Sequence, residues 1–238
     1  MIATITESLC QTSFPYGITA HYRPDASDER ALREVITKAT YRRTSLGFDV
    51  RRGERWLDLG ANIGAFAPYC KMNRATAVCY EPDPDCFAML SMNVPEFERH
   101  NVAITAHHEQ SLPFWKGKSP LDHYRATAIP SKTLPRHPSG VLRNQHGASL
   151  MHMTFDGVKM DIEGSEGELL DQELIPPCKK LCMEYHLSRD NSIENLDRRL
   201  RYLRRRFRHV HYVPELDRLI AAGVPAKTYF DRLIHCWD

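Results

Sequence analysis

A glycine-containing turn and a later acid are the residues best suited to chemistry in this sequence. The run Asp58–Gly64 reads Asp-Leu-Gly-Ala-Asn-Ile-Gly and follows a short apolar stretch expected to be a strand. Gly60 and Gly64 would let the backbone turn tightly and approach a ligand without a Cβ clash. Glu81 stands at the end of the next expected strand, where a carboxylate can accept hydrogen bonds from both hydroxyls of a ribose. This pattern predicts a nucleoside-containing ligand at the edge of a parallel sheet.

Two details of the turn discriminate between kinds of nucleoside. Asn62 stands where the dinucleotide fingerprint has its middle glycine, the residue that lets the backbone approach a pyrophosphate. A ligand without a pyrophosphate does not require that glycine. The carboxylate of Asp58, still on the strand, suits a ligand with a cationic amino group and a sulfonium. The spacing therefore favours a sulfonium nucleoside over a dinucleotide.

A second polar group follows two later strands. Asp161 and Glu163 lie at the end of the strand expected at 158–162, and alternation places both on one face. His186 directly follows the strand expected at 180–185. Glu184 shares a face of that strand with His186. Because the carboxyl ends of parallel strands meet at one edge of a sheet, we expect these four side chains to converge beside the glycine turn.

The elements that must position these residues alternate along the chain. This alternation predicts an α/β fold of the Rossmann-like type, with a mostly parallel central sheet and helices on both faces. The last two strands should form an antiparallel C-terminal hairpin at one edge of the sheet. The first 25 residues look irregular, and a helix should follow them as far as about Leu46. The expected strands are 55–59, 76–80, 102–106, 158–162, 180–185, 209–213 and 233–237.

The whole chain, 1–238, is expected to be a single domain. Residues 1–50 would form an N-terminal extension with its helix, and 51–238 the catalytic core. The stretch 110–155 is rich in Pro, His, Ser and Lys and fits no clear periodicity. A loop of this length inside a compact domain is usually functional or disordered. We expect it to be an acceptor-side insertion.

Four segments resemble the successive motifs of the FkbM family of class I S-adenosylmethionine-dependent methyltransferases. They are WLDLGANIGAFA, CYEPDPDCFAMLSMNV, VKMDIEGSEGELL and CMEYH, and together they span Arg55 to His186. The resemblance implies S-adenosyl-L-methionine as cofactor and methylation of a hydroxyl oxygen on a sugar or other small molecule. The cofactor-binding residues would then be Asp58, Gly60, Asn62, Gly64, Glu81 and Asp161.

Such a reaction is an in-line displacement that needs a positioned acceptor and a base. His titrates near neutral pH, so His186 is the expected base, with Asp161 as the other candidate. Asp161 or Glu163 could instead bind the acceptor hydroxyls. Three plainer alternatives are a capping role for Glu163, an edge role for His186, and a solvated or ion-paired Lys159. Asp161, Glu163 and His186 are also chemically suited to magnesium or manganese, but no dedicated ligand spacing supports a metal, and none is expected.

Charge and cysteine usage limit the other classes of function. The formal net charge is +2, which gives no overall attraction to nucleic acid or anionic membranes. The seven cysteines form no CxxC pair, so reduced thiols in a cytoplasmic protein are expected. The basic run 197–209 carries apolar residues at helical spacing, which indicates a packed helix with solvated arginines. A nucleic-acid methyltransferase and a non-catalytic S-adenosylmethionine-binding protein remain the alternatives.

Overall fold

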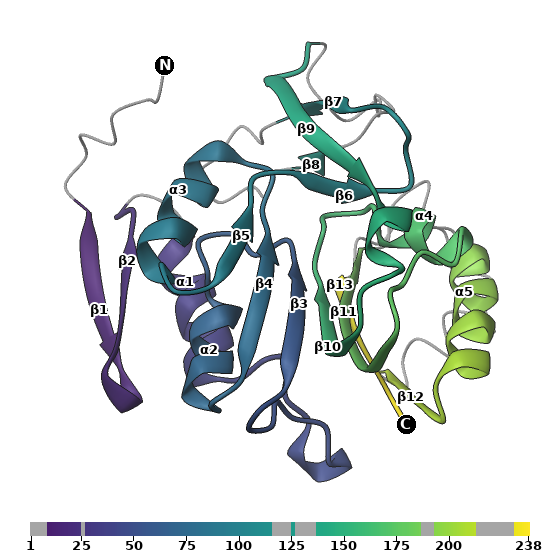
Figure 1. Cartoon of the computed structure of the whole chain (residues 1–238), viewed down its shortest axis with the longest axis horizontal. Helices are drawn as coiled ribbons and strands as arrows, with labels where there is room; N and C mark the ends of the chain where they lie inside the picture. The colour runs from purple at the N-terminus through teal and green to yellow at the C-terminus, as the bar shows by residue number, and fades with distance from the viewer. Residues whose placement is uncertain (1–8, 25–26, 116–124, 127–136, 187–192, 213–230) are drawn as a thin grey trace.

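A computed structural model of the chain describes residues 9–24, 27–115, 125–126, 137–186, 193–212 and 231–238 (Figure 1). Its centre is a seven-stranded sheet in the order β12-β13-β11-β10-β3-β4-β5. Neighbouring strands are parallel except around β13, which pairs antiparallel with both β11 and β12. The strands are β3 (Arg55–Leu59), β4 (Thr76–Tyr80), β5 (Glu98–His100), β10 (Phe155–Met160), β11 (Cys178–His186), β12 (His209–Tyr212) and β13 (Asp231–Trp237).

The strand order reverses between β3 and β10. From β3 the chain steps outward to β4 and β5, then returns to place β10 on the other side of β3. In open parallel sheets a ligand crevice lies at the carboxyl ends of the strands at such a reversal. The turn after β3 and the turn after β10 therefore flank the crevice.

Helices cover both faces of this sheet, as predicted. On one face Leu57 and Met160 belong to a core that includes Leu169 of α4 (Glu166–Asp171) and Leu200 of α5 (Ile193–Arg206). On the other face Trp56 packs in a core with residues of α2 (Phe66–Met72). Figure 1 shows α4 and α5 on one side of the sheet and α1, α2 and α3 on the other. The remaining helical segments are α1 (Asp28–Leu32), η2 (Arg33–Thr37), α3 (Pro84–Asn93), and the short turns η1 (Pro15–Gly17), η3 (Thr44–Leu46) and η4 (Gly147–Leu150).

Three expectations about the elements were wrong in part. The irregular N-terminus contains an antiparallel hairpin of β1 (Cys10–Phe14) and β2 (Ile18–Tyr22), too short and polar to give a clear strand pattern. The expected long helix stops before Ala39, whose φ of 50° is left-handed. The third strand of the main sheet is β5, not 102–106, which instead supplies β6 (Ala103–Thr105) to another sheet.

That other sheet organises part of the predicted insertion. It has four strands in the order β6-β9-β7-β8 and lies above the main sheet in Figure 1. Its insertion strands are β7 (Ser111–Trp115), β8 (Arg125–Ala126) and β9 (Gly140–His146). Most of the Pro-rich centre of the insertion, 127–136, lies outside the described residues. None of the described helices is long and apolar enough to span a membrane.

Candidate functional site

The turn after β3 is held against the end of β4 by backbone hydrogen bonds. The amides of Gly60 and Ala61 both donate to the carbonyl of Tyr80, each at 3.0 Å. The amide of Asn62 donates to Oε2 of Glu81 at 2.7 Å. Asn62 itself is left-handed, with a φ of 51°, a conformation that Asn tolerates better than most residues. The predicted turn and its distal acid are therefore brought together as one unit.

The two glycines of the turn adopt the tight backbone conformation that was expected of them, and each has a protein neighbour where a Cβ would lie. Both have positive φ, 76° at Gly60 and 87° at Gly64. A Cβ at Gly60 would lie 1.7 Å from the carbonyl oxygen of Asp161, and one at Gly64 would lie 2.9 Å from Cδ1 of Leu90. The close approach is thus to the protein's own backbone and to α3. Gly60 allows the turns after β3 and β10 to touch.

Glu81 is buried at the end of β4 with both oxygens engaged. Oε1 accepts the amide of Asp83 at 2.8 Å while Oε2 accepts that of Asn62. Burial raises the pKa of Glu81 to about 7, although the two amide donors favour the ionised form. Each carboxylate oxygen can accept a further hydrogen bond, so this network leaves acceptor capacity for the predicted contact with a ribose.

Asp58 is completely buried and faces Lys159 rather than the open edge of the sheet. Its Oδ1 lies 3.2 Å from Nζ of Lys159, which also donates to the carbonyl of Gly60 at 2.6 Å. Burial raises the pKa of Asp58, and Lys159 opposes that rise. Burial would lower the pKa of Lys159, but Asp58 and Asp161 outweigh it and raise that pKa. Of the alternatives for Lys159, the ion-paired one holds, because its side chain is only 5% exposed.

Asp161 connects the two halves of the crevice. Its amide donates to the carbonyl of Leu59 at 3.0 Å, which keeps it beside β3 after β10 has ended. Its Oδ2 accepts a hydrogen bond from the hydroxyl of Tyr41 at 2.9 Å. Its side chain is 24% exposed, and Nζ of Lys159 lies 3.9 Å from Oδ2. Asp161 is thus oriented by a tyrosine 120 residues earlier in the chain, a partner that no local pattern indicated.

A turn, rather than strand alternation, brings Glu163 toward His186. The strand ends at Met160, earlier than expected, and Glu163 then takes a left-handed φ of 54°. The turn amides of Ile162 and Gly164 donate to the carboxylate of Glu166, at 3.0 Å and 3.1 Å for the shorter contacts. Glu166 therefore caps these two amides of the turn.

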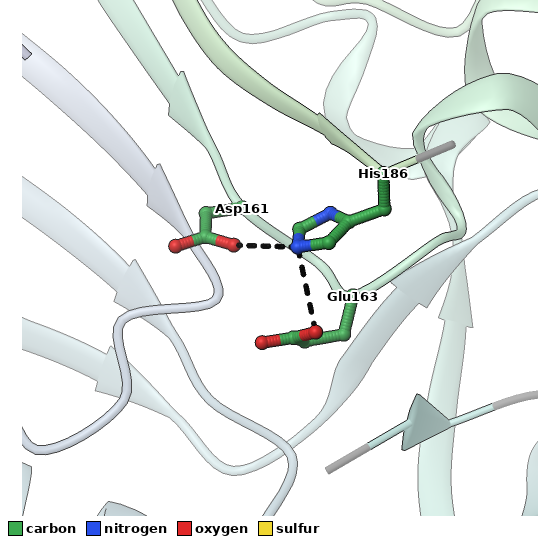
Figure 2. A group of neighbouring side chains, drawn as sticks. All are labelled: Asp161, Glu163 and His186. Atoms are coloured by element: carbon green, nitrogen blue, oxygen red, sulfur yellow. Dashed lines mark ion pairs between the residues drawn. The ribbon is translucent and has the colours of Figure 1, made fainter. Parts of the chain in front are cut away.

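His186 lies between three carboxylates. Its Nδ1 is 3.0 Å from Oε1 of Glu166, while its Nε2 is 3.4 Å from Oε2 of Glu163 and 3.9 Å from Oδ1 of Asp161. Figure 2 shows the side chains of Asp161 and Glu163 converging on the Nε2 side of the ring. The prediction that these three residues come together is confirmed by these distances. Glu166, completely buried, is a second site residue after Tyr41 that the sequence pattern did not indicate.

The charges around His186 act on one another strongly. Burial disfavours the imidazolium, but Glu166, Glu163 and Asp161 outweigh it and raise the pKa of His186 well above its ordinary value. Burial raises the pKa of Glu163, and the imidazolium of His186 opposes that rise. The group as a whole carries more carboxylates than cations, which is unusual for a partly enclosed position.

The arginines of α5 are mostly engaged within the protein. Arg199, expected on the outer face, is only 3% exposed and donates to Oδ2 of Asp171 at 2.7 Å. Arg206 donates to the carbonyls of Ile175 and Pro176. Arg205 pairs with Glu173 at 3.1 Å. These contacts attach α5 to α4 and the segment after it, and they reduce the positive charge that α5 presents to solvent.

Comparisons with known proteins identify the fold. No protein-family model and no curated protein matches the sequence. The structure is similar to M. jannaschii TYW2 solved with AdoMet, with a TM-score of 0.50 and 12% identity over 96% of this chain and 84% of that one. It is also similar to Pyrococcus abyssi tRNA (uracil-54, C5)-methyltransferase solved with S-adenosyl-L-homocysteine. The TM-score is 0.47, and the identity is 10% over 96% of this chain and 44% of that one. It is similar as well to P. horikoshii TYW2 solved with MeSAdo, with a TM-score of 0.46 and 12% identity over 97% of this chain and 72% of that one.

The chain thus spans 44% of the P. abyssi enzyme, less than half of that protein. At these identities the likeness concerns the fold alone. Together with the strand order, the likeness to the M. jannaschii structure defines a Rossmann-like methyltransferase fold.

Proposed function

We propose that this chain is an S-adenosylmethionine-dependent methyltransferase that acts on a hydroxyl oxygen of a sugar or other small molecule. The observation that carries the proposal is the contact between the two turns at the strand reversal. The turn at Gly60 and the backbone of Asp161 touch, so a donor held by the first turn would present its methyl group close to the polar residues after β10 and β11.

The donor would occupy the turn from Gly60 to Gly64, with its ribose hydroxyls on Glu81. Asp58 would act on this site indirectly, because its carboxylate is buried against Lys159. Lys159 in turn holds the carbonyl of Gly60 and so supports the turn. The FkbM resemblance agrees with this assignment, since its motifs include the turn, Glu81, and the run from Lys159 to Glu166.

The acceptor hydroxyl would be received by Asp161 and Glu163, whose side chains are 24% and 21% exposed. Methyl transfer forms a carbon–oxygen bond as the carbon–sulfur bond of the sulfonium breaks, and the hydroxyl proton leaves to a base. His186 is the predicted base: Glu166 holds its Nδ1, which directs Nε2 toward the acceptor as in a base–orienter pair. Because the surrounding carboxylates raise the pKa of His186, the imidazolium must first lose its Nε2 proton before the ring can accept the proton of the hydroxyl. Holding donor and acceptor in line can lower the barrier by ~7–11 kcal/mol.

The test is binding followed by turnover. S-adenosyl-L-homocysteine should raise the melting temperature of the protein, and NAD should not. S-adenosylmethionine with a panel of sugars and small alcohols should then yield S-adenosylhomocysteine. A protein stabilised by NAD and not by S-adenosylhomocysteine would contradict the donor assignment. Donor binding without turnover on any acceptor would leave the non-catalytic alternative.

A nucleic-acid acceptor is the alternative, and the name of one similar structure mentions tRNA. The intramolecular pairing of Arg199, Arg205 and Arg206 weighs against α5 as a phosphate-binding surface. Phosphate contacts make affinity fall steeply with salt. Binding of a transfer RNA that weakens by orders of magnitude between 50 and 200 mM salt, coupled to methyl transfer, would favour that alternative.

A further inference from the structure

The group formed by Asp161, Glu163 and His186 has the geometry of ligands around a cation. One ligand atom from each residue can be chosen so that all three lie within 4.8 Å of one another. Nε2 of His186 is 3.4 Å from Oε2 of Glu163 and 3.9 Å from Oδ1 of Asp161. Around an octahedral cation with bonds of about 2.1 Å, neighbouring ligand atoms lie about 3.0 Å apart. Modest side-chain rotation would therefore bring Nε2 of His186, Oε2 of Glu163 and Oδ1 of Asp161 to bonding distance of one ion.

Partners outside this group hold two of its members in the orientation that a metal requires. Nδ1 of His186 is 3.0 Å from the buried carboxylate of Glu166, which fixes Nε2 as the atom that faces Asp161 and Glu163. Metal-binding histidines nearly always give their second ring nitrogen to such a carboxylate or carbonyl. On the other side, the hydroxyl of Tyr41 occupies Oδ2 of Asp161, which leaves Oδ1 directed at the ring.

The electrostatics of the group also favour a cation. Asp161, Glu163 and Glu166 surround one imidazole, so three carboxyl groups face a single basic side chain. Lys159 lies 3.9 Å from Asp161 but is shared with the buried carboxylate of Asp58 at 3.2 Å. Gathering carboxylates in a partly enclosed place is costly unless a cation compensates them.

We propose that Asp161, Glu163 and His186 bind one divalent first-row metal ion, with Mn²⁺ as the probe that matches two carboxylates and an imidazole. Mixed oxygen and nitrogen ligands are suited to Mn²⁺, whereas an all-oxygen set would favour Ca²⁺ or Mg²⁺. Three protein ligands leave coordination positions open on the exposed side of Asp161 and Glu163. These positions would take the oxygen atoms of a hydroxylated acceptor, a step that rests on the proposed function, whereas binding of the ion does not.

Binding of Mn²⁺ alone to the full chain, stripped with a chelator and titrated calorimetrically, tests the site. The wild type should bind one ion per chain. Asp161→Asn and Glu163→Gln should each weaken binding by about tenfold or more, and Glu166→Gln by about 10–100-fold through the orientation of His186. Glu96→Gln is the matched control, because Glu96 is a surface acid paired with Lys71. No saturable binding to the wild type at millimolar Mn²⁺, or equal binding to all four variants, would overturn the site.

A second measurement needs no variant and so does not depend on folding of the mutants. Paramagnetic Mn²⁺ at low stoichiometry should broaden the ring resonances of His186 and spare those of His100, which is paired with Glu98 at the surface. Equal broadening of both rings would indicate adventitious binding and overturn the proposal. Stabilisation by S-adenosylhomocysteine is measured on the same samples. Donor binding without Mn²⁺ binding would contradict only the proposed metal site. Mn²⁺ binding without donor binding would contradict the proposed methyl transfer and leave the metal site standing.

Discussion

Gly60 and Asp161 lie so close that a Cβ on the glycine would sit 1.7 Å from the carbonyl oxygen of the aspartate. This contact joins the turns after β3 and β10, which belong to neighbouring strands at the reversal of the sheet order. It places the proposed donor turn against the first residue of the acceptor group. The relative position of the two half-sites therefore depends on backbone contact rather than on flexible side chains.

Replacing Gly60 with alanine should separate the two turns. The substitution adds a backbone clash to an unfavourable φ of 76°, so we expect the free energy of unfolding to fall by at least ~3 kcal/mol. Gly53→Ala is the matched control, because Gly53 has a φ of 83° and nothing within 4 Å of its Cβ position. It should cost only ~1 kcal/mol. Urea unfolding measures both, and equal losses would contradict the importance of the contact.

Lys159 should be needed for stability because its removal leaves Asp58 buried without a cation. We expect Lys159→Met to lower the free energy of unfolding by ~3–5 kcal/mol. Lys179→Met is the control: Lys179 is also paired, with Asp156 at 3.2 Å, but its side chain is 75% exposed. Exposed pairs contribute ~0–1 kcal/mol. Similar losses in the two variants would show that the buried pair has no special role.

Donor affinity should depend on pH through Glu81. Its pKa is raised to about 7 by burial, and ribose hydroxyls would donate to the ionised form. S-adenosylhomocysteine should therefore bind more weakly as pH falls below about 7, approaching a tenfold loss per pH unit. Glu81→Gln should bind more weakly, by ~1–3 kcal/mol, and with little pH dependence. Calorimetry between pH 5.5 and 8 measures this, and a parallel pH profile in the variant would exclude Glu81 from the donor site.

The same group makes a separate prediction for the ligand-free protein. Because the folded-state pKa of Glu81 lies above the ordinary carboxyl value, the folded state binds the proton more tightly than the unfolded state. The contribution of Glu81 to the free energy of unfolding is complete below pH 4.5 and is lost as pH rises through about 7. The loss is at most ~3 kcal/mol. Urea unfolding of Glu81→Gln should show a shallower downward slope, because the raised pKa of Glu163 contributes a slope of the same sign. An unchanged slope would assign it to another group.

His186 as the base and His186 as a metal ligand give different kinetics. For a base, His186→Ala should lower kcat by ~10²–10⁴-fold with donor affinity unchanged, whatever the Mn²⁺ concentration. For a ligand, raised Mn²⁺ should restore part of the activity. His209→Ala, at an exposed histidine on β12, is the control and should keep normal kcat. A near-normal kcat in His186→Ala would leave Asp161 as the better candidate for the base.

The insertion 110–155 should contribute to acceptor selection. Shortening it between Ser131 and Gly140 should spare binding of S-adenosylhomocysteine and reduce turnover, because the strands of the insertion form a sheet separate from the one that carries the donor turn. Donor binding is measured by calorimetry and turnover by release of S-adenosylhomocysteine. Loss of donor affinity in a folded variant would place the segment in the donor site.

Local patterns in the sequence determined the strand–turn–helix from Arg55 to Met72, the strand that ends before Glu81, and the convergence of Asp161, Glu163 and His186. Continuous apolar runs and glycines at fixed spacing carry this information, because a buried parallel strand and a tight turn each depend on a few neighbouring residues. The antiparallel pairing of β12 and β13 was also predictable from two short apolar runs near the end of the chain.

Only the tertiary structure decided how the site is held together. Tyr41 donates a hydrogen bond to Asp161, which lies 120 residues later in the chain. Lys159 pairs with Asp58 on the adjacent strand, and the buried carboxylate of Glu166 contacts His186. The same is true of β5 and β6, two short neighbouring segments that the structure assigns to different sheets. Ion pairs and close backbone contacts form between segments that the sheet order brings together, and hydrophobic periodicity describes only one segment at a time.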